Sequence, residues 1–228
     1  MKKITITFIV VLLLLAPNLL AVNIDNMKIE IPQEYYDLKT AIDNDDTKIA
    51  YYEALLNTTK EELKQQIKTN NILYLGKNTN LSKTLMINEL QTGATKRIFH
   101  LHLASEEQVS KLKTELTEEA TSGAMQIENI SVYDVNGIRW IESNLKSGTD
   151  KVTQYYTIIN GKGITISLQN AYTNTKQDEL KEIIDTAEFT NLEEKPADMA
   201  FYVMVAVTVL LVIIVIVLAV MAFSKKKD

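Results

Sequence analysis

The two histidines of this chain, His100 and His102, are separated by a single residue. Residues 97–103 alternate apolar and polar side chains, which predicts a half-buried strand. Positions i and i+2 of a strand project to the same face, so the two imidazole rings could bind one metal ion. A third ligand would have to come from elsewhere, for example from Glu106 or Glu107. The simpler interpretation is a polar strand face that binds nothing.

Catalytic chemistry is not indicated by any other motif. The chain contains no cysteine, no H-E-x-x-H and no G-x-S-x-G, so zinc catalysis and an activated nucleophile are not expected. The run Asp43-Asn44-Asp45-Asp46 resembles a calcium loop but lacks its glycine at position six and its glutamate at position twelve. It predicts a solvated loop before a helix instead. We expect no enzyme and no cofactor, with a hydrolase of dispersed site residues as the alternative.

Aromatic residues are the remaining candidates for recognition. Trp140 is the only tryptophan, and three tyrosine doublets occur, at positions 35–36, 51–52 and 155–156. Neighbouring residues of a strand point to opposite faces, so some of these tyrosines could contribute to a binding surface. We expect Trp140 to anchor the core, with exposure for partner docking as the alternative.

The C-terminal segment predicts where the protein is located. Residues 199–223 are apolar without a charge, and Lys225, Lys226 and Lys227 follow. A helix of about 20 apolar residues crosses a hydrocarbon core, and a positive flank remains in the cytoplasm. The run contains neither GxxxG nor an ionisable residue, so anchoring is its expected role.

The N-terminal segment has the layout of a secretory signal peptide. Lys2 and Lys3 precede an apolar stretch that Pro17 and Asn18 interrupt, and cleavage is expected after Ala21. An uncleaved anchor is the alternative. The predicted organisation is therefore a signal peptide (1–21), an extracytoplasmic domain (22–198), a transmembrane helix (199–223) and a cytoplasmic tail (224–228). Such a type I protein spans the cell membrane once.

The net charge of the outer domain restricts the classes of molecule that it is expected to bind. Without the terminal segments, 19 basic and 28 acidic residues remain, a net charge of about −9. Such a surface repels phosphate backbones, so nucleic-acid binding is not expected. Because the chain has no cysteine, the exported domain has no disulfide bonds, and its hydrophobic core must stabilise the fold.

The apolar pattern predicts helices that alternate with strands. Helices are expected at residues 49–56, 59–69, 105–121 and 175–187, the second and third opened by Thr59 with Glu62 and by Ser105 with Gln108. Strands are expected at residues 29–31, 72–75 and 83–90, in addition to 97–103, and Phe189 begins a short closing strand.

Two Asn-Gly pairs decide the fold class. Asn136-Gly137 lies between two β-rich runs and predicts a two-residue hairpin turn. Its register then places Asp134 opposite Arg139 and Tyr133 opposite Trp140. Asn160-Gly161 predicts a second hairpin, with a loop of two or four residues. Tight turns join antiparallel strands, so we expect an α+β fold whose antiparallel sheet is covered by helices on both faces, an α/β/α sandwich.

Three segments carry a resemblance to a known family. IEIPQEYYDL, KEELKQQIKTNNILYL and QYYTIINGKGITISLQN with LKEIIDTAEF are similar to the PsbP-like (Mog/PsbP-type) proteins, especially to the membrane-anchored extracytoplasmic members of Gram-positive bacteria. The resemblance spans most of residues 27–190 and rests on pattern, not on an invariant motif. It implies an α/β/α sandwich outside the membrane and partners that are proteins. It implies no catalytic residues.

The function expected from these features is binding. The anchor, the single outer domain and the missing catalytic motifs together predict a membrane-tethered module that binds a protein or a cell-envelope component. The alternative is an accessory subunit that senses a ligand or a metal, with His100 and His102 as candidate ligands, and acts through a membrane partner.

Overall fold

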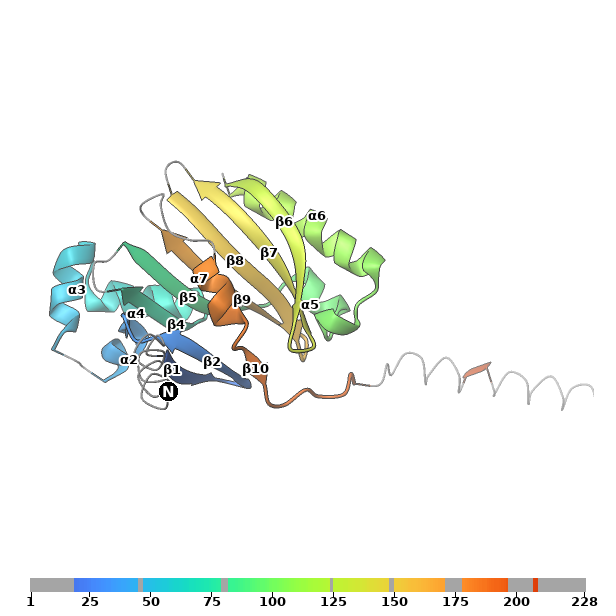
Figure 1. Ribbon diagram of the computed structural model, residues 1–228, viewed down its shortest axis with the longest axis horizontal. Coiled ribbons are helices and arrows are strands. Elements are labelled where there is room, and N and C mark those ends of the chain that lie inside the picture. Colours follow the sequence, from blue (N-terminus) through green and yellow to red (C-terminus); the bar gives the residue numbers. More distant parts are fainter. Residues whose placement is uncertain are drawn as a thin grey trace, which may run out of the picture. The chain divides into compact units, whose positions relative to one another are not determined.

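A seven-stranded antiparallel sheet forms the centre of the computed structural model (Figure 1). The model describes residues 19–44, 47–78, 82–123, 125–147, 150–170, 178–196 and 207–208. The strand order is β3-β4-β5-β9-β8-β7-β6. The strands are β3 (Tyr35–Asp37), β4 (Ile72–Asn78), β5 (Lys83–Leu90), β6 (Gln126–Val135), β7 (Ile138–Ser147), β8 (Asp150–Ile159) and β9 (Lys162–Asn170).

A three-stranded sheet and a set of helices cover this sheet. The small sheet has the order β1-β2-β10, with β1 (Leu19–Ile24), β2 (Met27–Pro32) and β10 (Glu188–Phe189). The helices are α2 (Leu38–Asp43), α3 (Ile49–Leu56), α4 (Lys60–Thr69), α5 (Gly93–Arg97), α6 (Glu106–Ser122) and α7 (Asp178–Ile184), with a 3-10 turn, η1 (Leu101–Leu103). Chain packing separates a unit ending at Glu193, which holds this domain, from a second unit that begins at Glu194.

The register of the large sheet follows from its two Asn-Gly turns. Asn136 and Gly137 have φ angles of 52° and 74°, the left-handed pair that a tight type I′ turn requires. Tyr133 consequently faces Trp140 and Asp134 faces Arg139, as predicted. The second turn, at Asn160-Gly161, has two residues, because Ile159 pairs with Lys162. The predicted antiparallel α+β arrangement is confirmed.

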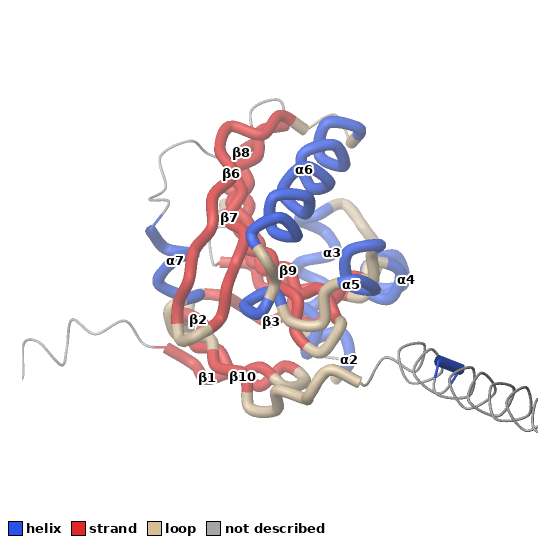
Figure 2. The backbone as a smooth tube through the Cα atoms, turned by 90° about the vertical axis from the view of Figure 1, so that its right-hand side faces the viewer, coloured by secondary structure: helices blue, strands red, loops and turns tan. Residues whose placement is uncertain are grey.

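Both faces of the large sheet are buried, by different elements. On one face, α7 and the small sheet enclose a core that contains Trp140, Tyr155 and Ile166. On the other face, α5 and α6 pack on Ile141, Tyr156 and their neighbours. Helices α2, α3 and α4 form a separate cluster beside β4. Figure 2 shows α6 and α7 on opposite sides of the strands. The expected two-sided cover is therefore present, although a small sheet shares one side with a single helix.

The predicted helix starts and ends depend on local caps. Thr59 and Ser105 form the expected capping boxes with Glu62 and Gln108. Each box pairs backbone N–H groups that the first helical turn leaves without partners. Helices α3, α4 and α6 and the closing strand β10 lie where they were predicted. Helix α7 begins at Asp178, because the preceding residues 171–177 lie outside the described part of the chain.

The predicted strand at residues 97–103 is wrong. The chain forms α5 up to Arg97 and then the turn η1. Ile98 and Leu101 are buried, whereas Leu103 is 74% exposed. A spacing of three between buried residues fits a tight turn, while the alternation in the sequence suggested a strand. Thr92 starts α5 by accepting hydrogen bonds from the backbone of Ala94 and Thr95.

Two predicted terminal segments fall largely outside the described residues. Of residues 199–223, only Val207 and Thr208 are described, and both are helical. Within the described ranges, no helix is both long and apolar enough to span a bilayer. At the other end, β1 pairs Leu19 with Pro32 and Ile24 with Met27. Cleavage after Ala21 would therefore remove the first half of β1 and leave its pairs from Val22 onward.

Candidate functional site

His100 holds together two segments that are distant in the sequence. Its Nδ1 accepts a hydrogen bond from the backbone N–H of Asn160 at 3.4 Å, and its Nε2 lies 2.7 Å from the carbonyl oxygen of Glu193. A nitrogen that accepts cannot carry the proton, so Nε2 is protonated and donates to Glu193. The Asn160 amide adds bonds to Asn191 and Glu193. His100 therefore joins the β8–β9 turn to the segment that follows β10 and contains Asn191 and Glu193.

His102 lies next to His100, the other candidate metal ligand. The ring centroids are 5.2 Å apart. Both nitrogens of His100 are engaged, and the Nδ1 of His102 is buried without a hydrogen-bond partner in the described structure. Burial, and then the nearby His100 and Arg139, lower the pKa of His102. Within the described residues, no three His, Asp or Glu side chains form a group that could hold a metal ion.

Replacement of His100 by alanine should destabilise the domain by roughly 1–3 kcal/mol, because a buried ring is removed and the backbone groups of Asn160 and Glu193 lose their hydrogen-bond partner. The matched change His102→Ala removes a half-buried ring that has no hydrogen bond at Nδ1, and we expect less than about 1 kcal/mol. Urea unfolding of both variants measures the difference. Equal losses would contradict the structural role of His100.

The other predicted candidates are mostly structural. Asp43 ends α2 and forms an i,i+4 ion pair with Lys39 at 2.9 Å, whereas residues 45 and 46 lie outside the described part of the chain. Trp140 is fully buried, so the core interpretation is confirmed over docking. Of the six doublet tyrosines, only Tyr51 is mostly exposed, at 60%. Tyr155 and Tyr156 are both buried, because the sheet is covered on both faces.

Two polar clusters that the sequence analysis missed attach α7 to the domain. At one end of the helix, Tyr35 donates to Glu179 at 2.6 Å, and Glu179 also pairs with Lys83. At the other end, Tyr133 and Lys181 both bond Asp185. Each cluster joins residues more than 45 positions apart, so only the folded chain brings them together.

Burial and hydrogen bonds shift the pKa values of groups in these clusters. The pKa of Tyr35 is raised far above its ordinary value, first by burial and then by its hydrogen bond to Glu179. Its hydroxyl therefore remains a proton donor at all physiological pH values. The hydrogen bonds of Lys181 to Tyr133 and Asp185 raise its pKa. Groups held in this way stabilise structure and are not poised for proton transfer near neutral pH.

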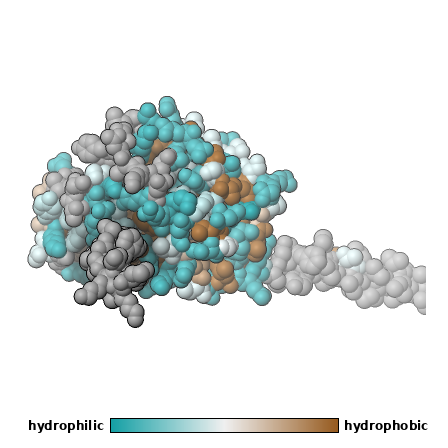
Figure 3. Space-filling model, viewed as in Figure 1, coloured by the Kyte–Doolittle hydropathy of each residue, from teal (hydrophilic) through white to brown (hydrophobic). Residues whose placement is uncertain are grey.

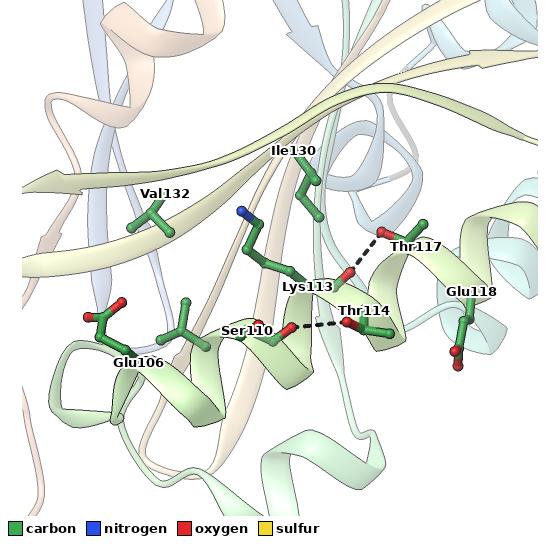
Figure 4. Close-up of a pocket in the computed structure, with 9 residues that line it drawn as sticks. Glu106, Ser110, Lys113, Thr114, Thr117, Glu118, Ile130 and Val132 are labelled. Atoms are coloured by element: carbon green, nitrogen blue, oxygen red, sulfur yellow. Dashed lines mark hydrogen bonds between the residues drawn. The ribbon is translucent and has the colours of Figure 1, made fainter.

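A groove lies between α6 and β6. This groove has a volume of about 610 Å³. Its apolar residues are Val109 of α6 and Ile130 and Val132 of β6. The polar rim comes from α6, and consists of Glu106, Ser110, Lys113, Thr114, Thr117 and Glu118 (Figure 4). Hydrophobic side chains reach the surface on the half of the domain that carries β6 and α6 (Figure 3).

Several polar side chains that line the groove are engaged within the domain. The Thr114 and Thr117 hydroxyls donate to helix carbonyls of Ser110 and Lys113 (Figure 4). Glu106 is paired with Arg139 at 3.1 Å. Val132 is 40% exposed, so part of the apolar floor of the groove is open to solvent. Sequence spacing alone could not place α6 against β6.

Comparisons with known proteins bear on the fold. No protein-family model and no curated protein matches the chain. Among solved structures, the chain is similar to cyanobacterial PsbP (CyanoP) from Synechocystis sp. PCC 6803, with 13% identity, a TM-score of 0.43, and 75% of this chain and 91% of that chain covered. A protein from Bacteroides thetaiotaomicron VPI-5482 has 11% identity and a TM-score of 0.38, over 76% of this chain and 47% of that one. The likeness agrees with the PsbP-like fold expected from the sequence and concerns the fold alone.

Proposed function

We propose that this chain is a membrane-tethered extracytoplasmic domain that binds a protein or cell-envelope component and has no catalysis of its own. The observation that carries the proposal is the open groove between α6 and β6, whose apolar floor includes the exposed Val132. A concave surface with apolar residues beside the edge strand of a sheet is a place where a partner segment can pack and pair. The apolar run at residues 199–223 supports the tether.

The disposition of the reactive side chains supports binding over catalysis. His100 uses both ring nitrogens in backbone hydrogen bonds. Glu179 and Asp185, which lie beside lysines and tyrosines, are engaged in attaching α7. A general acid or base needs a group free to exchange protons with a substrate, and these groups already serve the fold.

In-cell cross-linking of the full-length chain tests this function. A photo-reactive residue is placed singly at Tyr51, Lys28, Glu61 and Thr114, which lie on different elements. We expect at least one position to form discrete adducts of higher mass that sediment with membranes. Extracellular protease should remove the domain from intact cells and leave a tag after Asp228 intact. Full-length protein free in the soluble fraction, or no adduct from any position, would overturn the proposal.

A sensing role is the second candidate, favoured by the buried Nδ1 of His102. An unpartnered buried nitrogen is a potential ligand, and the ring of His100 is 5.2 Å away. Calorimetry with zinc should then show heat that a double His100→Ala and His102→Ala variant loses. Identical heats for both proteins would exclude zinc sensing by this pair.

A further inference from the structure

Among the described strands, β6 forms one edge of the large sheet. The sheet ends with β6 on one side and with β3 on the other. Strand β3 has three residues, whereas β6 has ten. A long unpaired edge presents a row of N–H and C=O groups that another strand can join. Of the two edges, β6 is therefore the one that can accept a strand of useful length.

The register identifies which backbone groups of β6 are free. Val135 and Ile138 flank the two-residue turn and so form a hydrogen-bonded pair. Hydrogen-bonded and non-bonded pairs alternate along antiparallel strands, so Tyr133 and Ser131 also bond to β7. The N–H and C=O groups of Ile130, Val132 and Asp134 consequently point away from the sheet.

Two of these edge residues, Ile130 and Val132, have side chains that lie in the groove. Ile130 and Val132 line its floor opposite Val109. A strand added to β6 would place every second side chain over this floor, because side chains alternate between the two faces. Apolar residues at those positions would cover the exposed part of Val132. Backbone pairing and side-chain burial therefore favour the same occupant, an extended segment.

The charged residues on the rim of the groove indicate which charged residues the added segment would contain. Glu106 and Glu118 stand at the two ends of the groove, twelve helix positions apart, which is about 18 Å at 1.5 Å per residue. Positions i and i+6 of a strand are separated by roughly 20 Å. Two basic residues at that spacing would each lie near one glutamate. The Lys113 side chain extends toward β6 between them (Figure 4), where a carbonyl of the added strand can accept from it.

We propose that β6 and the groove beside α6 bind an extended segment of a partner protein, with apolar side chains at alternate positions and a basic residue at each end. The segment adds to the sheet as an eighth strand. This inference rests on the proposed binding function and names its site and the chemistry of its partner. The acidic net charge of the domain favours a basic segment over a second copy of this chain.

The test uses the full-length protein in detergent and the synthetic peptide KTVTVTK. Hydrogen exchange of backbone amides is followed by nuclear magnetic resonance as the peptide is added. We expect the amides of Ile130, Val132 and Asp134 to become protected, because they alone gain partners. Those of Ser131 and Tyr133 should not change, since β7 already bonds them. Protection without this alternation, or no protection at any peptide concentration, would overturn the proposal.

Single substitutions distinguish the contribution of backbone pairing at the β6 edge from the contribution of the rim charges. Val132→Pro removes one free N–H without touching the ladder to β7 and should weaken peptide binding by about tenfold, whereas Val132→Thr keeps the amide and should retain most affinity. Glu118→Gln should weaken binding about threefold. Glu107→Gln is the control, because Glu107 is on α6 but does not line this groove. The peptide ETVTVTE should bind more weakly than KTVTVTK.

The outcomes also separate this inference from the proposed function. Cross-linked adducts from Tyr51 or Lys28, but none from Thr114, would leave the binding function standing and overturn the β6 site. Protection of the same edge amides by raising the protein concentration without peptide would identify a second copy as the occupant, which contradicts a partner segment. Adducts from Thr114 that Val132→Pro abolishes would support both.

Discussion

Trp140→Ala is expected to lower the free energy of unfolding by about 3–5 kcal/mol, the largest effect of any single change considered. The indole is fully buried in the core between the large sheet, α7 and the small sheet. Its centroid lies 6.2 Å from that of Phe189 in β10. Alanine would leave a cavity that the surrounding side chains cannot fill completely, because the interior is close-packed and relaxes only in part. A domain of ordinary stability, about 5–15 kcal/mol, would lose a large part of it.

Urea unfolding followed by circular dichroism measures this loss without relying on the deleted fluorophore. Val132→Ala is a suitable control, because Val132 lies on the neighbouring strand but is 40% exposed. We expect Val132→Ala to lower the free energy of unfolding by less than about 1 kcal/mol. A Trp140→Ala variant as stable as the original protein would refute the position of the indole and return it to the docking role considered from the sequence.

The β-hairpins were predictable because their signals are local. Asn136-Gly137 needs positive φ at both positions, and few residue pairs other than Asn-Gly accept that geometry. Once the turn is placed, the pairs Tyr133 with Trp140 and Asp134 with Arg139 follow by counting. Helix starts were predictable for the same reason, since a capping box is complete within four residues.

The errors occurred where local pattern and tertiary packing disagree. Three apolar residues at alternate positions, Phe99, Leu101 and Leu103, suggested a strand, but Ile98 and Leu101 are the buried ones. The start of α5 was missed because Thr92 caps it with Thr95 at the third helical position, where the usual signal is Glu or Gln. Strand β1 overlaps the last residues of the predicted signal peptide (1–21), and the apolar composition there did not indicate a strand.

The candidate binding site could not be predicted from sequence. The groove exists because α6 and β6 are neighbours on one face, a relation that no motif encodes. What the sequence could show was β6 itself, through its turn and its alternating apolar residues. That β6 ends the sheet follows only from the strand order, in which β5 pairs with β9 and leaves β6 outermost. Polar clusters such as Tyr35 with Glu179 depend on the same long-range order.

Lys83→Met is expected to lower the free energy of unfolding by about 2–4 kcal/mol, because it leaves the half-buried carboxylate of Glu179 without its cation. The two side chains are only 16% and 18% exposed. Glu179 retains one hydrogen bond, from Tyr35. Glu179→Gln should lower the free energy of unfolding by a similar amount or less, because the Lys83 ammonium then keeps only its longer contact with Glu34, at 3.9 Å. The amide oxygen of the glutamine can still accept from Tyr35.

A double-mutant cycle distinguishes the pair from its individual residues. The double variant Lys83→Met with Glu179→Gln has no buried charge left at this position, so it should be more stable than the sum of the single losses by about 1–3 kcal/mol. The same cycle on Lys39 and Asp43, an i,i+4 pair whose side chains are 32% and 53% exposed, should give about 0.3–0.5 kcal/mol. Urea unfolding supplies all the values. Equal coupling in the two cycles would mean that water screens Lys83 and Glu179 as it screens a surface pair, and that this ion pair contributes little to the attachment of α7.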